Sequence, residues 1–102
     1  MEKINLDSFD LIQLKKRLWV IKLEFDLIYG EGADVPETLD FCRQKVEQNF
    51  CFNNPETNIN VVVSHLSLFV NDIPYNNFSK IMELETPLMT LMKENNLQIC
   101  LN

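Results

Sequence analysis

Glycine, histidine and long apolar runs are scarce in this chain of 102 residues, which contains two glycines and one histidine. No apolar run approaches the ~20 residues that a transmembrane helix needs. The N-terminus shows no basic segment followed by an apolar one, so no secretory signal is predicted. With 46% apolar residues the chain is not of disordered or low-complexity type. We therefore expect one cytoplasmic domain over residues 1–102 that does not bind a membrane.

Cysteine is too sparse and too irregularly spaced to predict a disulfide-stapled fold. The three cysteines are Cys42, Cys51 and Cys100, and they form no C-x-x-C pair. An odd number of thiols without metal-ligand spacing argues against a disulfide-rich secreted domain and against a zinc site. We expect a reducing cytosolic environment, no metal site and no cofactor.

Basic residues are absent from a window that carries the whole net charge of −6. This acidic window lies between Leu23 and Cys42, and the rest of the chain balances nine acidic against nine basic side chains. Its carboxylates are those of Glu24, Asp26, Glu31, Asp34, Glu37 and Asp40. A block of one sign attracts a partner of the opposite sign. It predicts a basic protein partner and argues against nucleic acid.

Helix signals accompany the prolines and the leucine-rich N-terminal segment. Residues 7–17 combine a possible Asp7 or Ser8 cap with apolar side chains on one side. Asp34 and Pro36 predict the start of a second helix, which continues to residue 50. Thr86 followed by Pro87 predicts the start of a third helix, which ends at residues 95–96.

Strand signals occupy the segments between these helices. Residues 19–29 alternate apolar and largely charged side chains over eleven positions, which is typical of a strand with one buried face. Residues 59–70 are rich in β-branched side chains, residues 97–101 form a short apolar run, and residues 78–85 alternate, although a short helix competes there. After the first helix the order predicts a ferredoxin-like βαββαβ sheet in an α+β domain, with helices on one face. We expect one core containing Trp19, Ile21, Leu23, Phe25, Val46, Phe50 and Leu91.

Candidate chemical groups are few. His65 is predicted to be a strand histidine without a catalytic role, because no motif places a serine or cysteine near it. Glu24 and Asp26, two residues apart on a strand, would point the same way and could hold Mg²⁺, but no third ligand is in register. Phe25-Asp26-Leu27 resembles the first strand of small ferredoxin-like ribonucleases, namely the CRISPR-associated spacer-acquisition endonuclease and virulence-associated protein D. That resemblance implies metal-dependent RNA cleavage by Asp26 in a symmetric dimer.

Two further segments resemble known families. Leu6-Asp7-Ser8-Phe9-Asp10 is similar to the acyl carrier motif, in which the serine would carry phosphopantetheine. We interpret it as a helix cap, because carriers have a complete helix before that serine. The segment from Asp26 to Glu37 resembles immunity proteins of nuclease colicins, in which an acidic stretch with exposed tyrosines binds the basic toxin. It comprises residues 26–29, the acidic loop over residues 30–34, and Pro36-Glu37.

The leading hypothesis is a small acidic protein-binding module and not an enzyme, most simply an inhibitor or immunity-type protein that blocks a basic partner such as a nuclease toxin. An aromatic anchor among carboxylates suits such a partner. The predicted partner-binding residues are Glu24, Asp26, Tyr29, Glu31, Asp34, Glu37 and Asp40. The alternatives are the ribonuclease using Asp26 and a regulatory ligand-binding domain, and the chain could also form a homodimer. A merely solubilising acidic face is the competing interpretation of the window.

Overall fold

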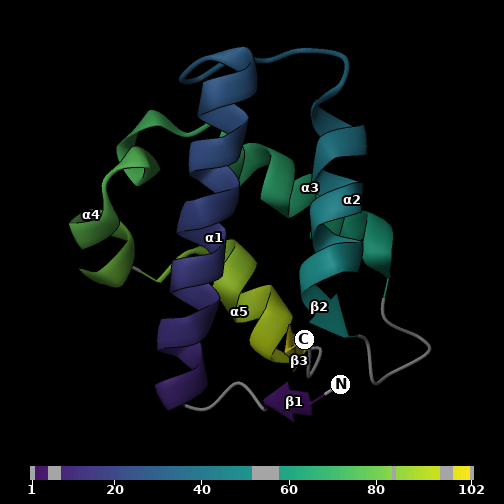
Figure 1. Cartoon of the computed structure of the whole chain (residues 1–102), viewed down its shortest axis with the longest axis vertical. Coiled ribbons are helices and arrows are strands. Elements are labelled where there is room, and N and C mark those ends of the chain that lie inside the picture. The colour runs from purple at the N-terminus through teal and green to yellow at the C-terminus, as the bar shows by residue number, and fades with distance from the viewer. Residues whose placement is uncertain (1, 5–7, 52–57, 84, 95–97, 102) are drawn as a thin grey trace.

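In a computed structural model of the chain, helices predominate over short strands (Figure 1). The structure describes residues 2–4, 8–51, 58–83, 85–94 and 98–101, and only the backbone for 2–4, 8–10 and 98–101. The elements in this part are β1 (Glu2–Ile4), α1 (Ser8–Tyr29), α2 (Thr38–Asn49), β2 (Phe50–Cys51), α3 (Ile59–Val70), the 3-10 helix η1 (Ile73–Asn76), α4 (Phe78–Glu83), α5 (Pro87–Glu94) and β3 (Gln98–Leu101).

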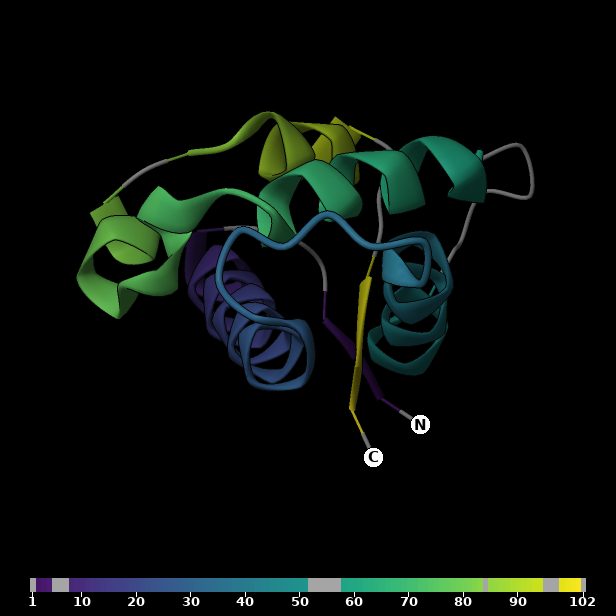
Figure 2. The same ribbon diagram turned by 90° about the horizontal axis from the view of Figure 1, so that it is seen from above.

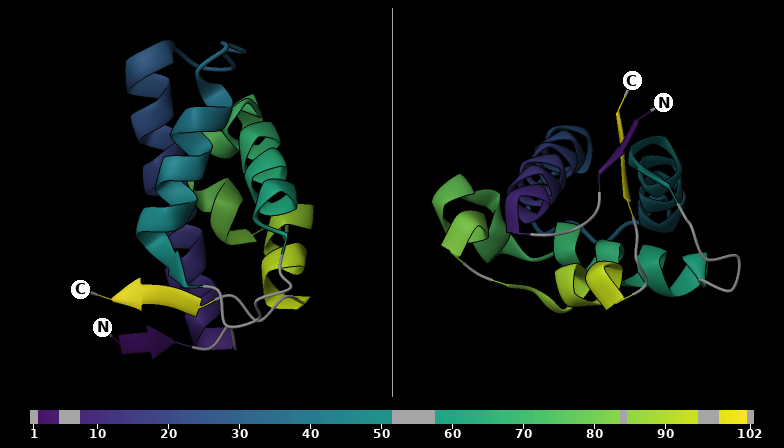
Figure 3. Two further views of the ribbon diagram at one scale, coloured as in Figure 1. Left: turned by 90° about the vertical axis from the view of Figure 1, so that its right-hand side faces the viewer. Right: turned by 90° about the horizontal axis from the view of Figure 1, so that it is seen from below.

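The helices form two layers. Helices α1 and α2 lie side by side in one layer, α3 and α5 lie across them in the second, and η1 and α4 flank α1 (Figure 2). The three strands form one small antiparallel sheet in the order β1-β3-β2, with Lys3 opposite Cys100 and Phe50 opposite Ile99. This sheet lies at the end of the molecule where α1 begins and α2 ends (Figure 3).

The predicted ferredoxin-like βαββαβ sheet is therefore wrong, and so is the α+β class. The largest error concerns residues 19–29, which continue the N-terminal helix as far as Tyr29 in a single helix of 22 residues. Its buried apolar positions alternate three and four residues apart, at Leu14, Leu18, Ile21 and Phe25. That spacing marks one face of a helix. No glycine or proline interrupts it before Gly30, whose φ of 101° and N–H bond to the Asp26 carbonyl end the helix.

The predicted strands over 59–70 and 78–85 are also helices. Helix α3 begins at Asn58, whose side chain accepts a hydrogen bond from the N–H of Asn60. Its buried residues follow the three-and-four spacing of one helix face, and they are Val62, Val63, Leu66, Phe69 and Val70. In α4 the competing helical interpretation of 78–85 is correct over Phe78–Glu83. Asn77 caps it by accepting from the N–H of Ser79 at 2.9 Å.

The capped helices were predicted more accurately. Helix α5 begins after Thr86, whose Oγ1 accepts a hydrogen bond from the Met89 N–H at 3.2 Å. The second predicted helix exists as α2, but its N-cap is Glu37, which makes no side-chain cap bond, and not Asp34. The predicted final strand is confirmed over Gln98–Leu101. Asp7, residues 52–57 and Leu97 lie outside the described residues.

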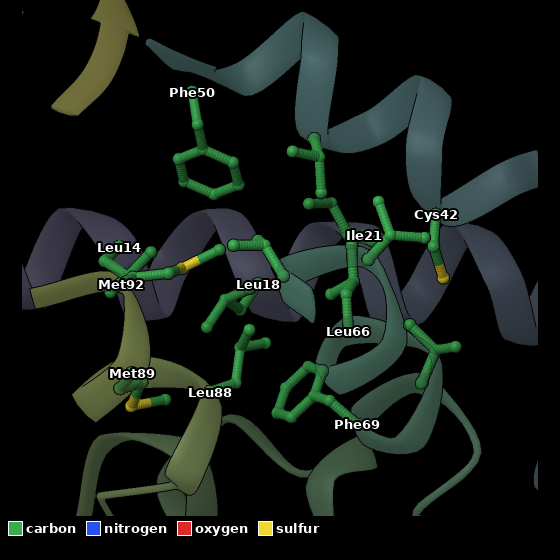
Figure 4. Close-up of a cluster of buried hydrophobic side chains, with 14 of the residues drawn as sticks. Leu14, Leu18, Ile21, Cys42, Phe50, Leu66, Phe69, Leu88, Met89 and Met92 are labelled. Carbon is green, nitrogen blue, oxygen red and sulfur yellow. The ribbon is translucent and has the colours of Figure 1, made fainter. Parts of the chain in front are cut away.

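One hydrophobic core fills the space between the two layers (Figure 4). It includes four of the residues predicted for it: Ile21, Phe25, Val46 and Phe50. Trp19 and Leu91 pack against its edge, whereas Leu23 is half-exposed and is not part of it. Cys42 is a free thiol inside this core. Cys51 is disulfide-bonded, which the expectation of reduced cysteines did not anticipate. No helix in the described part of the chain has the length and apolar character needed to cross a membrane.

A lysine is among the largest fully buried side chains of the structure. Lys22 belongs to the largely charged positions of the segment predicted as a strand, yet none of its surface is exposed. Its Nζ donates to the Val70 carbonyl at 2.8 Å and to Oδ1 of Asp26 at 3.1 Å. Lys15, seven residues earlier on the same face of α1, donates to the Met82 carbonyl at 3.0 Å. Each lysine thus joins α1 to the C-terminal end of another helix, where unpaired carbonyls favour a cation.

Replacing Phe25 tests the helical assignment of residues 19–29. Its ring is fully buried, 5.0 Å from the Tyr29 ring and 5.5 Å from the Phe41 ring between centroids. We expect Phe25→Ala to lower the free energy of unfolding by about 3–5 kcal/mol in urea denaturation. Leu27 would share the buried face of a strand, but it is 87% exposed. Leu27→Ala should therefore change stability by less than about 0.5 kcal/mol, and equal losses would contradict the helix.

The buried Lys22 is tested with a double-mutant cycle. Lys22→Met leaves the Asp26 carboxylate, whose side chain is 10% exposed, without its cation. We expect it to cost about 3–5 kcal/mol of unfolding free energy, as removal of one partner of a buried pair does. Adding Asp26→Leu should recover part of that loss, because no lone charge then remains. Lys16→Met, at an exposed lysine of the same helix, is the control. Additive losses in the double variant would show that the two groups do not interact.

Candidate protein-binding site

Three pairs of side chains join α1 to α2 at successive levels along the helices, and we call these pairs the rungs. Arg17 donates to Oδ1 of Asn49 at 3.0 Å near the sheet. Glu24 forms an ion pair with Lys45 at mid-height. At the far end the rings of Tyr29 and Phe41 meet edge to face, 6.1 Å apart. Because the residue numbers of these pairs rise along α1 while they fall along α2, the two helices run antiparallel. A groove lies between them.

The upper part of this groove is acidic. A hollow of about 360 Å³ opens there, and it is lined by Glu24, Ile28, Tyr29, Glu37, Asp40, Phe41, Gln44 and Lys45. We call these residues the acidic groove. Lys45 is its one cation, and it is engaged by Glu24 and lies 5.5 Å from the centre of the Phe41 ring. Glu37 and Asp40 are exposed and form no ion pair within the described part of the chain. Two uncompensated carboxylates therefore flank a half-buried tyrosine.

The connection between α1 and α2 explains this arrangement. Gly30 and Gly32 both adopt positive φ values, 101° and 69°, which lets the chain reverse just after α1. A Cβ on Gly32 would lie 3.0 Å from the Ile73 side chain, so the turn packs closely on η1. Pro36 precedes α2, and Thr38 accepts a hydrogen bond from the N–H of Val35 at 3.3 Å. Glu37 and Asp40 then lie at the N-terminal end of α2, where negative charge is stabilised by the helix dipole.

The structure brings together four of the seven predicted partner-binding residues. Glu24, Tyr29, Glu37 and Asp40 line the groove. Glu31 and Asp34 are exposed in the loop between the helices and do not line it. Asp26 is turned to the buried Lys22. The prediction that Glu24 and Asp26 point the same way fails because both lie on a helix, where residues two apart diverge.

Sequence reasoning missed the apolar and basic members of the groove. Ile28 is 61% exposed, and Phe41 and Lys45 form two of the rungs. A helical reading of residues 8–29 would have found them. Arg17, Glu24 and Ile28 follow one helix face at spacings of seven and four, and Phe41, Lys45 and Asn49 follow another at spacings of four.

A second hollow continues the groove toward the sheet. It measures about 300 Å³ and is lined by Lys16, Arg17, Val20, Ile21, Glu24 and Asn49. Glu24 belongs to both hollows. The groove therefore has a basic end at Lys16 and Arg17 and an acidic end at Glu37 and Asp40. Burial lowers the pKa of Arg17 from its usual value.

The remaining chemical candidates do not assemble into a site of comparable charge. His65 is half-buried, its Nδ1 lies 2.9 Å from the Val61 carbonyl, and it borders a hollow of about 190 Å³ between α3, η1 and α5. That volume is below the ~300 Å³ typical of small-molecule sites. Among the described residues, no three His, Cys, Asp or Glu side chains are close enough to hold a metal ion.

Comparisons with known proteins yielded no relatives. No protein-family model matches the chain, and neither the curated proteins nor the solved structures include a significant match. The resemblances to immunity proteins, ribonucleases and carrier proteins are therefore limited to the short segments named above.

The Cys42 thiol is free and fully buried in the hydrophobic core, so its reactivity reports on whether the core stays packed. Burial raises the pKa of Cys42 to about 12. We expect the Cys42 thiol to resist alkylation by iodoacetamide at pH 8 in the folded protein and to react in urea. Mass spectrometry of the peptide that contains Cys42 measures the extent of alkylation. A raised folded-state pKa also means that the unfolded thiol ionises first. Stability should therefore fall as pH rises from about 9 towards 12, and Cys42→Ala should flatten that decline.

Proposed function

We propose that this chain is a small acidic protein-binding module whose acidic groove docks onto a basic surface of a partner protein. An inhibitor or immunity-type protein that blocks a basic active site, such as that of a nuclease toxin, is the concrete form of this proposal. The observation that carries it is the gathering of Glu24, Glu37 and Asp40 around Tyr29 and the exposed Ile28.

Charge and apolar area would contribute to binding in different ways. The uncompensated Glu37 and Asp40 would speed encounter with a basic surface, because steering acts before contact and decays over a Debye length of ~8 Å at physiological ionic strength. Ile28 and the edge of Tyr29 would supply the area that is buried on contact, and therefore slow dissociation. The net charge of −6 argues against a nucleic acid as the partner, because the phosphate backbone is also negatively charged.

The two alternatives gain no support from the geometry. The ribonuclease hypothesis required Asp26 on the first strand of a ferredoxin-like sheet, but Asp26 lies on a helix and is paired with Lys22. A ligand-binding domain would need a predominantly apolar cavity of at least ~300 Å³. The hollow beside His65 measures about 190 Å³, and a hollow of about 320 Å³ between α1 and α5 is lined by three charged side chains, those of Glu85, Lys93 and Glu94.

The acidic groove is tested by binding kinetics. Proteins captured from the source cells and identified by mass spectrometry supply the basic partner, and the rates are then measured with purified components at two salt concentrations. We expect Glu37→Lys/Asp40→Lys to slow association at least about tenfold at low salt and to weaken its salt dependence. Ile28→Ala should act mainly on dissociation. It is preferred to a change at Tyr29, whose ring packs on Phe25 and Phe41.

A matched control separates local from overall charge. Glu83→Lys/Glu94→Lys makes the same change in net charge at exposed positions on α4 and α5, outside the groove. It should leave the association rate near that of the unaltered protein. If both double reversals slow association equally, only net charge matters. If neither alters it, the acidic window is a solubilising face.

A further inference from the structure

The outer face of α1 exposes apolar side chains that no described element covers. Val20 is 47% exposed and Leu27 is 87% exposed, and Leu23 between them is half-exposed. At spacings of three and four these residues form one stripe, opposite to the stripe that enters the core. In Figure 1 α1 stands in front of α3 and α5, and in Figure 2 its lower side is open. Exposed apolar stripes on a long helix commonly mark an interface.

The charges along this stripe are arranged symmetrically about Val20. Lys16 precedes Val20 by four residues and Glu24 follows it by four. Glu24 pairs with Lys45 of its own chain, but 43% of its side chain stays exposed and can approach a second cation. At 1.5 Å per residue each lies about 6 Å from Val20 along the helix axis. Two such helices packed antiparallel, with a two-fold axis at Val20, therefore place each lysine at the level of the other copy's glutamate. A surface that complements itself in this way fits an isologous contact.

We propose that α1 packs antiparallel against α1 of a second copy of this chain, about a two-fold axis at Val20. Val20 meets Val20 at the axis. Lys16 of one copy approaches Glu24 of the other on both sides of it. Leu27 comes level with Gln13 of the other copy, beside the half-exposed Ile12. Antiparallel helix dipoles add a favourable term.

Charge complementarity is the reason to assign a second copy to this face. A basic partner would meet Lys16, and an acidic one would meet Glu24, whereas a second copy satisfies both. The hollow of about 300 Å³ beside Val20 leaves room for the valine side chain that arrives at the axis. A contact made by one helix from each copy is small, so the dimer should be weak and concentration-dependent. Glu37 and Asp40, on α2, remain free for the proposed partner.

The test introduces a charge at Val20, because a residue on a two-fold axis meets the same residue of the other copy. The full chain is studied by sedimentation velocity from low to high micromolar concentration. The unaltered protein should show a dimer that grows with concentration. Val20→Glu and Val20→Lys should each weaken it at least about tenfold, because like charges face each other. An equimolar mixture of the two variants should associate again as a heterodimer, because one acid then faces one base.

Matched variants at Leu68 control for charge and solubility. Leu68 is 69% exposed on α3, away from α1, so Leu68→Glu and Leu68→Lys should dimerise like the unaltered protein. Circular dichroism checks that all variants keep their helices. The proposal is overturned if the unaltered protein is monomeric at every concentration, if its dimer is insensitive to Val20, or if mixing the two Val20 variants restores nothing. None of these outcomes affects the acidic groove, which is tested at Glu37 and Asp40.

Discussion

The ammonium group of Lys22 is buried completely, and the position of α1 depends on how that charge is satisfied. A cation removed from water needs both a counter-charge and hydrogen-bond acceptors. Asp26, one turn later on the same helix, supplies the charge, and the Val70 carbonyl at the end of α3 supplies an acceptor from another helix. Because that carbonyl is at a helix terminus, it has no partner within α3. The lysine therefore determines where α3 ends against α1, and Lys15 makes the equivalent contact with the end of α4.

Because one side of α1 is buried around Lys22, only the acidic residues on its other sides remain available to bind a partner. Asp26 is used internally, whereas Glu24 lies on the side facing α2, where it pairs with Lys45 and borders both hollows of the groove. The acidic window is thus divided by the helix that carries it. Its loop residues and the first turn of α2 contribute the uncompensated charge. Glu24 lies between the groove and the outer face of α1, and 43% of its side chain is exposed although it pairs with Lys45.

The errors in the predicted fold arise from one ambiguity. Residues 19–29 satisfy a two-residue alternation, and they also satisfy a three-and-four repeat that begins before them at Leu14 and Leu18. The alternation was misleading because charged residues were assumed to face water, and Lys22 does not. The same bias turned the β-branched residues of α3 into a strand, although β propensity is weak against the packing of a helix face. The capped helices were easier, because a cap such as Thr86 acts over three residues and needs no distant partner.

Features that depend on local chemistry or on composition could be predicted from the order of residues. These are the start of α5, the existence of α2, the final strand, the net charge and the concentration of acids between Leu23 and Cys42. Which of those acids face the groove could not be predicted in this way, because it follows from how the helices pack. That choice depends on the burial of Lys22 and on rungs between residues 32, 21 and 12 positions apart, Arg17 with Asn49, Glu24 with Lys45, and Tyr29 with Phe41. Such contacts form only when two helices pack, and nothing in the local order of residues specifies which helix will be the neighbour.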